Sequence, residues 1–151
     1  MVAVLQKNGE QSIGKSRGGW TTKLHMLAAN ERIAVAFHLS GGGCHDAPQG
    51  RKLLETQGSV HTNISLLMDR AYEGDNTRDL ALELGYGLCV PPKSNRKESW
   101  GYDHDLYKRR NEVERLFRRL KAYRRIFTRY DKLDLVFLAF VFFALIVEAL
   151  R

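Results

Sequence analysis

Four polar residues at fixed spacing constrain this chain more than any other feature. The segment LYKRRNEVERLFRRLK contains the pattern Y-x2-R-x3-E-x6-K, formed by Tyr107, Arg110, Glu114 and Lys121. If the segment is one helix, these residues and Arg118 fall within roughly 80° of one another around its axis. A separate apolar stripe lies beside them at the spacing of a packed helix face and comprises Val113, Leu116, Phe117 and Leu120.

The polar face of this predicted helix sets a carboxylate among cations and a phenol. Glu114 is flanked there by Arg110 and Arg118, with Tyr107 at the start of the face. A carboxylate in this setting is suited to holding a divalent metal ion over a phosphate backbone. A surface helix with salt bridges has the same composition, but the four-residue spacing favours a functional site.

A second acidic candidate, Asp69, directly follows the short apolar stretch 64–68, in the context D-R-A-Y. The small side chain of Ala71 would let the backbone approach a substrate, and Tyr72 would pack behind it. An ordinary strand-end aspartate that caps a turn has the same local features.

Positive charge is concentrated around the four-residue pattern. Between Lys93 and Arg129 there are 13 Lys and Arg residues against 5 Asp and Glu residues, although the whole chain has a net charge of only +7. Aromatic residues are interleaved with these cations. Such a block suits salt-sensitive binding to a phosphate backbone, and a solvated basic face is the alternative interpretation.

Strand and helix patterns alternate along the chain and predict an α/β fold with a mixed sheet. The strands are expected at 21–28 and 33–39, as a hairpin, and then at 64–68 and 88–90. Asp46 is the expected N-cap of a helix that extends to about Gln57. Further helices are expected at 77–84, over the polar pattern, and at 135–147.

The remaining features indicate a soluble cytosolic protein. Cys44 and Cys89 are too few and too far apart for a metal site or a disulfide framework. The uncharged run 135–147 is short for a bilayer and typical of a buried core helix. Asp134 and Glu148 at its ends are expected to lie in water.

Several segments, taken together, resemble DDE-type bacterial insertion-sequence transposases, whose catalytic domain is RNase H-like. The polar pattern resembles the C-terminal signature of that family. The other resembling segments, in chain order, are SRGGWTTKLHMLAANERIAVAFHLSGGGCHD for the first paired strands, LLMDRAYEG for the strand before the second catalytic aspartate, VPPKSNRK for a strand exit, and RYDKLDLVFLAFVFFALIVEALR for the closing helix. The resemblance covers residues 16–151, and residues 1–15 form a non-matching N-terminal segment.

The resemblance implies a role for each site residue. Asp69 and Glu114 would be catalytic and would bind Mg²⁺ or Mn²⁺, in a reaction where two such ions assist in-line displacement at phosphorus. Tyr107 and Arg110 would contact DNA near the cleaved end, and Lys121 would hold a phosphate. Backbone affinity would come from Arg118, Arg119, Arg124 and Arg125.

The family's first catalytic aspartate has no counterpart in this chain. Residues 1–15 contain Glu10 as their only acid, and no aspartate. The RNase H-like domain is therefore expected to be incomplete, lacking the central strand that bears this residue. Residues 1–5 are β-prone and would replace only part of that strand, or another polypeptide would supply it. The chain resembles the downstream half of a transposase that is encoded in two overlapping frames.

Three functional hypotheses follow from the sequence. In the first, the chain performs DNA transposition, with cleavage and strand transfer at terminal inverted repeats and target DNA, once a fused or partner polypeptide supplies the first aspartate. In the second, it is an inactive remnant that binds DNA or inhibits the full-length enzyme. A generic basic RNA-binding protein is the third, and the acids at motif positions argue against it. The expected setting is the bacterial cytoplasm, at the nucleoid, with an upstream-frame polypeptide or a homo-oligomer as partner and no membrane.

Overall fold

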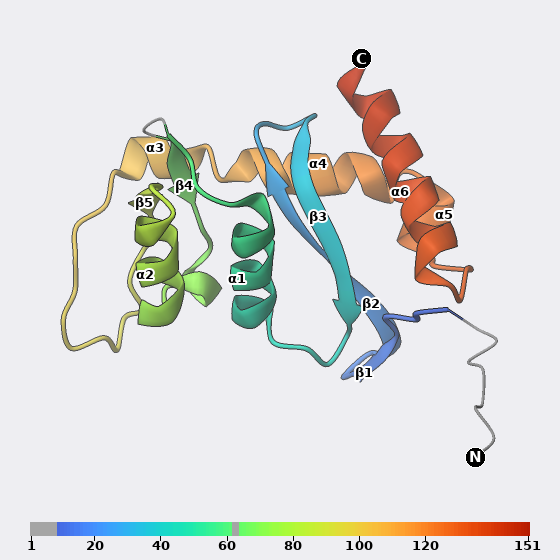
Figure 1. The fold of residues 1–151 in the computed structure, drawn as a ribbon, viewed down its shortest axis with the longest axis horizontal. Helices are drawn as coiled ribbons and strands as arrows, with labels where there is room; N and C mark the ends of the chain where they lie inside the picture. The colour runs from blue at the N-terminus through green and yellow to red at the C-terminus, as the bar shows by residue number, and fades with distance from the viewer. Residues whose placement is uncertain (1–8, 62–63) are drawn as a thin grey trace.

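The computed structural model describes residues 9–61 and 64–151 and has a mixed α/β architecture (Figure 1). Its strands are β1 (Gly14–Ser16), β2 (Gly19–Ala28), β3 (Ala34–Gly41), β4 (Ser65–Leu67) and β5 (Gly87–Cys89). Its helices are α1 (Asp46–Gln57), the 3-10 helix η1 (Arg70–Tyr72), α2 (Asp75–Glu83), α3 (His104–Lys108), α4 (Asn111–Lys121), α5 (Arg124–Phe127) and α6 (Asp134–Ala149). The predicted order of strands and helices is confirmed, while β1, η1 and α5 are additional.

The first three strands form an antiparallel sheet with β2 in its centre. The predicted hairpin is confirmed, because β2 and β3 pair along most of their length. Asn30 closes its turn by accepting hydrogen bonds from the backbone N–H groups of Arg32 and Ile33. The β1–β2 turn ends at Gly19, whose φ of 106° is readily adopted only by glycine.

The other two strands, β4 and β5, form a separate parallel pair. The strands of the described residues therefore make two sheets where one mixed sheet was expected. One core lies under this second sheet, where Leu54 of α1 and Ala81 of α2 pack with Leu66 and Val90. Helix α1 stands between the two sheets in Figure 1, so it contacts both β2 and α2.

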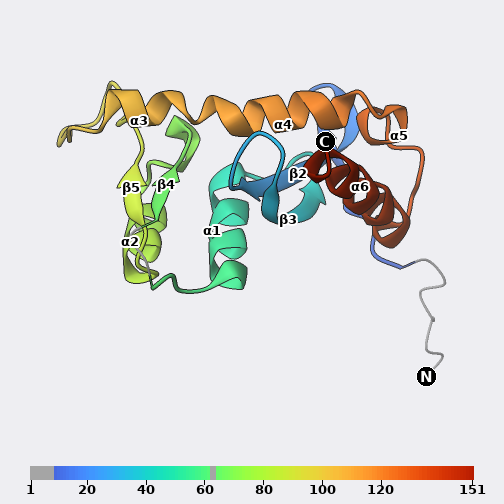
Figure 2. The same cartoon turned by 90° about the horizontal axis from the view of Figure 1, so that it is seen from above.

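Helices α3 and α4 run one after the other along one side of both sheets (Figure 2). The sequence predicts a single helix here, whereas the structure has a tight turn at Arg109 and Arg110. Both of their backbone N–H groups bond to a carbonyl three residues earlier, which tightens the helix locally. Beyond the turn, Leu116 and Leu120 are fully buried against α6 and form the second core.

The closing helix lies in the core by one face only, which carries Phe137 and Val141, and the prediction that its ends are solvated is wrong. Asp134 and Glu148 are buried, whereas Leu135 and Phe143 of the same helix are exposed. Asp134 accepts hydrogen bonds from Ser12 and pairs with Arg129 at 2.6 Å. Both ends of α6 are thus held by ion pairs with neighbouring segments.

The start of α1 also differs from its prediction. Asp46 is the first helical residue, and the N-cap is His45, whose side chain makes no capping hydrogen bond. The Asp46 carboxylate instead accepts a hydrogen bond from the Lys23 ammonium at 2.8 Å, which ties α1 to β2. The β-prone stretch 1–5 lies outside the described residues. In the described part of the chain, no helix is long and apolar enough to cross a membrane.

Candidate functional site

The structure brings Asp69 and Glu114 to the two sides of one guanidinium. Arg110 Nη2 donates to Glu114 Oε1 at 2.8 Å, and Arg110 Nη1 lies 3.9 Å from Asp69 Oδ2. The carboxylates are about half exposed, at 58% for Asp69 and 48% for Glu114. The predicted catalytic pair therefore lies together, open to solvent, with a cation between its members.

Asp69 reaches this position from the end of β4. Its Oδ1 accepts a hydrogen bond from the Arg70 backbone N–H at 2.6 Å, so it also caps η1. Tyr72 packs behind η1 as predicted, against Gly50 of α1, where a Cβ would lie 2.5 Å from its ring. Burial, with the nearby charges of Asp46 and Asp69, raises the pKa of Tyr72 to about 12.

The signature helix supplies the opposite wall. Burial tends to lower the pKa of Arg110, but the hydrogen bond and charge of Glu114 and the charge of Asp69 outweigh it and raise that pKa. The guanidinium therefore stays charged. Its carbon lies 5.8 Å from the centre of the Tyr107 ring, and burial raises the pKa of that phenol. Tyr107 is thus neutral beside Arg110, and both belong to the same site.

A cavity of about 490 Å³ opens beside these residues, and a second of about 520 Å³ continues it along β2 and β4. Residues of β2, β4, α1 and α4 line the first cavity. Apolar side chains line most of it, including Leu54 of α1 and Val113 of α4. Asp69 and Glu114 line the first cavity, and Ile64 and Ala29 line the second.

Glu73 is a residue that the sequence analysis missed. It is only 4% exposed, and it pairs with Lys93 at 3.2 Å and with Arg96 at 3.0 Å. Burial alone would raise the pKa of Glu73, but these two cations hold it below its usual value. Arg96 also stacks on Trp100. The loop between β5 and α3 is thereby fixed to the segment that follows Asp69. The signal in the sequence was Lys93 and Arg96, two of the three cations in VPPKSNRK.

The cations predicted to bind DNA differ in whether they form ion pairs or hydrogen bonds with other side chains. Among the described residues, Arg118 and Lys121 have no carboxylate within ion-pairing distance. Arg124 donates to the Tyr130 hydroxyl, and Arg125 pairs with Asp131 at 3.0 Å. Arg118 and Lys121 lie in the last turn of α4, further along the helix than Glu114. They form a cationic surface beside the carboxylate pair.

No group of three or more His, Cys, Asp or Glu side chains in the described part of the chain could hold a metal ion. The buried His25 bonds to Ser40 at 2.8 Å, and burial lowers its pKa, so it serves the hairpin. Asp69 and Glu114 are hard oxygen donors of the kind that Mg²⁺ and Mn²⁺ prefer. They fit as two members of a larger ligand set.

Comparison with known proteins gives two matches. The family model described as "Transposase DDE domain" matches residues 5–147. A Brucella ovis protein named as a transposase for insertion sequence element IS6501 is 32% identical over 126 residues, which are 82% of this chain and 94% of that protein. No solved structure matches.

Proposed function

The chain belongs to the transposase DDE domain family, and from this premise we propose that it carries two of the catalytic carboxylates of an insertion-sequence transposase. The reaction is metal-dependent cleavage and strand transfer of DNA at the ends of the element. Asp69 and Glu114 are its catalytic and metal-binding residues. The observation that carries the proposal is their meeting at Arg110, from distant parts of the chain, at the mouth of one cavity.

The remaining carboxylate, the family's first aspartate, comes from a strand that is not among the described residues, on a fused or partner polypeptide. Three features of the described residues support this. The strands fall into two sheets, β2 and β4 line the same cavity, and the sides of that cavity are mainly apolar. A strand between them, parallel to β4, would end beside Asp69 and would complete an RNase H-like sheet.

Each side chain has a role in this proposal. When bound, the divalent metal ions activate the attacking oxygen and stabilise the leaving one. Asp69 and Glu114 hold these ions, and Arg110, released from the carboxylates, contacts a DNA phosphate as a fork of donors. Tyr107 orients the DNA near the cleaved end. Lys121 holds a phosphate of the terminus, while Arg118, Arg124 and Arg125 add salt-sensitive backbone affinity.

The first test is to sequence the DNA upstream of the Met1 codon and to express the two frames as one polypeptide. This fusion is expected to cut the ends of its own element with Mg²⁺, whereas the 151-residue chain does not. Cleavage by the 151-residue chain would refute the need for a supplied strand. Stop codons upstream would favour a decayed fragment.

The catalytic assignment is tested in the fusion with Glu114→Gln, which is expected to lower cleavage at least a thousandfold and to leave DNA binding within threefold. Glu112→Gln is the matched control, because Glu112 lies two positions before Glu114 on the same helix and pairs with Arg109. Equal cleavage by the two variants would show that Glu114 is not a catalytic residue.

The second candidate function is an inactive remnant that binds DNA or inhibits the full-length transposase. The absence of a three-acid group among the described residues favours it, as do the unpaired cations of α4. It predicts binding that weakens steeply with salt and ignores Mg²⁺. In either role, we place the protein at the bacterial chromosome in the cytoplasm.

A further inference from the structure

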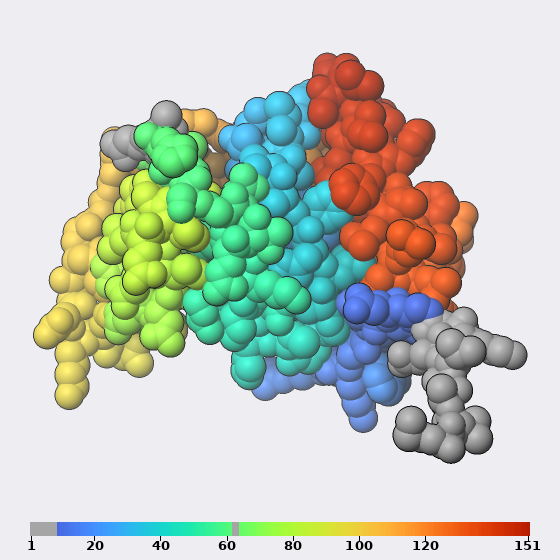
Figure 3. Space-filling view, in the orientation of Figure 1, coloured from blue at the N-terminus to red at the C-terminus, as the bar shows by residue number. Residues whose placement is uncertain are grey.

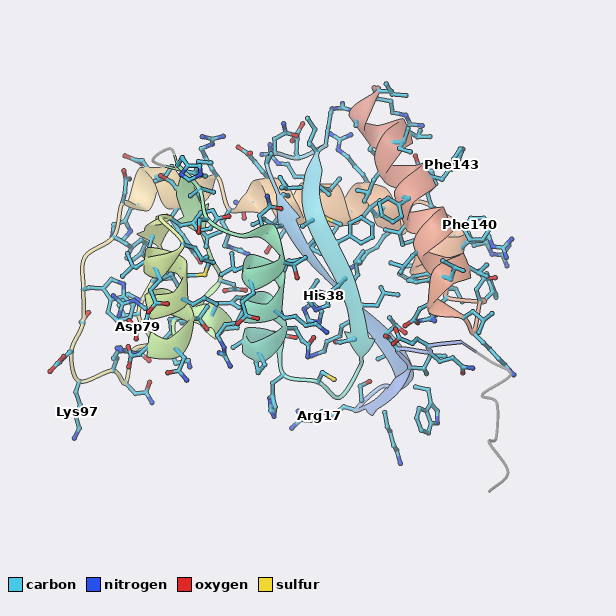
Figure 4. All side chains as sticks on the ribbon, in the orientation of Figure 1. Arg17, His38, Asp79, Lys97, Phe140 and Phe143 are labelled. Carbon is cyan, nitrogen blue, oxygen red and sulfur yellow. The ribbon has the colours of Figure 1, made fainter. Side chains whose placement is uncertain are left out.

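One face of α6 is apolar and exposed. Helix α6 forms an outer flank of the molecule, visible in the space-filling view, and Phe143 points away from the body in the stick view (Figures 3 and 4). The opposite face, with Phe137 and Val141, is buried in the second core. The exposed positions, here called the α6 face, are Leu135, Val136, Ala139, Phe142, Phe143, Ile146, Ala149 and Leu150.

This α6 face is symmetric about the midpoint between Phe142 and Phe143. A twofold rotation about an axis that passes through this point, perpendicular to the helix, brings every exposed position onto another exposed position. Two of the four resulting pairs set a larger side chain against alanine, and the other two set large side chains against each other. The resulting pairs across an antiparallel contact are Leu135 with Leu150, Val136 with Ala149, Ala139 with Ile146, and Phe142 with Phe143. The eight positions span roughly 140° around the axis, the width of a packed face.

The size of the face fits a dimer. Its six large side chains are between 39% and 83% exposed. They place roughly 600 Å² of apolar surface on one side of the molecule, at the upper end of what a monomer usually exposes. A standard interface buries about 800 Å² per partner, so the apolar face supplies roughly three quarters of that area and the residues around it would supply the rest.

We propose that the α6 face binds the same face of a second copy of this chain across a twofold axis, with the two helices antiparallel. No charged residue stands among the eight positions, so no unpaired charge would be buried. Antiparallel helices also oppose their dipoles, which favours the contact. This inference is independent of the catalytic assignment.

The test measures the mass of the 151-residue chain by analytical ultracentrifugation at tens of micromolar. The wild type is expected to be a dimer, and Phe143→Glu to be a monomer with dimer affinity reduced at least a hundredfold. Leu82→Glu is the matched control, because Leu82 is 56% exposed on the distant helix α2. It is expected to remain a dimer. A monomeric wild type, or equal behaviour of the two variants, would overturn the proposal.

Cysteine cross-linking tests the antiparallel arrangement without introducing a charged residue into the α6 face. In a Cys44→Ser background, Phe143→Cys is expected to form a disulfide dimer, because two copies of this position meet near the axis. Leu135→Cys is not, because its two copies lie roughly 22 Å apart along the helices. Equal cross-linking of both variants would indicate parallel helices, and cross-linking of neither would place the contact elsewhere; each result rejects the proposal.

Discussion

Asp69 and Glu114 share one counterion, since the Arg110 guanidinium donates to Glu114 at 2.8 Å and lies 3.9 Å from Asp69. Without metal, Arg110 offsets the charge that two adjacent carboxylates bring together. It therefore holds the two carboxylates close together, and in the proposed metal site it would compete with the ion for the same oxygens. The competition can be measured.

Arg110→Gln is expected to increase the affinity of the chain for Mn²⁺ several-fold, because it removes the competing cation from both carboxylates. Isothermal titration calorimetry with MnCl₂ measures this affinity. Arg109→Gln is the control, because Arg109 pairs with Glu112 outside the site. Equal affinities for the two variants would mean that Asp69 and Glu114 do not bind the ion.

Gly50→Ala is expected to destabilise the chain by roughly 1–3 kcal/mol, although the same change usually stabilises a helix. The new Cβ would lie 2.5 Å from the Tyr72 ring and would push η1, which begins directly after Asp69. Urea unfolding measures the free energy. A Gly50→Ala/Tyr72→Ala double variant separates the clash from a helix effect, because the second change removes the ring. A gain in stability for the single variant would contradict this packing.

Asp134→Asn is expected to cost roughly 2–4 kcal/mol, because it leaves the Arg129 side chain, which is only 10% exposed, without its carboxylate. Burial would raise the pKa of Asp134, but the hydrogen bonds from Ser12 and the charge of Arg129 hold it below 3.8.

This lowered pKa gives the wild type a stability that is complete above about pH 5 and is lost as pH falls below 4 toward the folded-state pKa. Unfolding curves between pH 3 and 7 are expected to show less of this loss in Asp134→Asn. The exposed Asp105→Asn should behave as the wild type. Identical pH profiles for wild type and Asp134→Asn would refute the role of this ion pair.

Lys121→Ala is expected to lower the slope of log K against log salt by about one, and to weaken binding to all DNA sequences alike. Lys121 has no ion-pairing partner among the described residues. Arg119 is the contrasting position, because it pairs with Glu31 at 3.3 Å and packs beside Glu148. Arg119→Ala should leave the slope unchanged, and fluorescence anisotropy across a salt series distinguishes the two. Equal slopes would show that α4 does not face DNA.

Local patterns predicted much of this fold. The hairpin around Asn30, the helix that ends at Gln57 and the strand before Asp69 all depend on neighbours in the sequence, so their periodicity and turn residues were sufficient. The turn at Arg110 was not predicted, because a helix and a helix with a tightened turn have the same apolar spacing.

The charges were harder to predict. Asp46 satisfies the pattern of an N-cap, but Lys23 on β2 is its partner. The cations between Lys93 and Arg129 predicted one DNA-binding surface. In the structure, however, Arg115, Arg119 and Arg125 are paired with carboxylates from other segments or turns. Sequence spacing does not record such partners.

The sequence by itself determined which residues are candidates for the site, because the four-residue spacing and the D-R-A-Y context are properties of single segments. Only the tertiary structure decided that Asp69 and Glu114 share Arg110 and that Glu73 anchors the loop between β5 and α3. It also decided which side of α6 is exposed. Helix α6 is apolar all round, so periodicity cannot identify its buried face. Burial and ion pairing arise between distant segments, and their free energies exist only once the chain is packed.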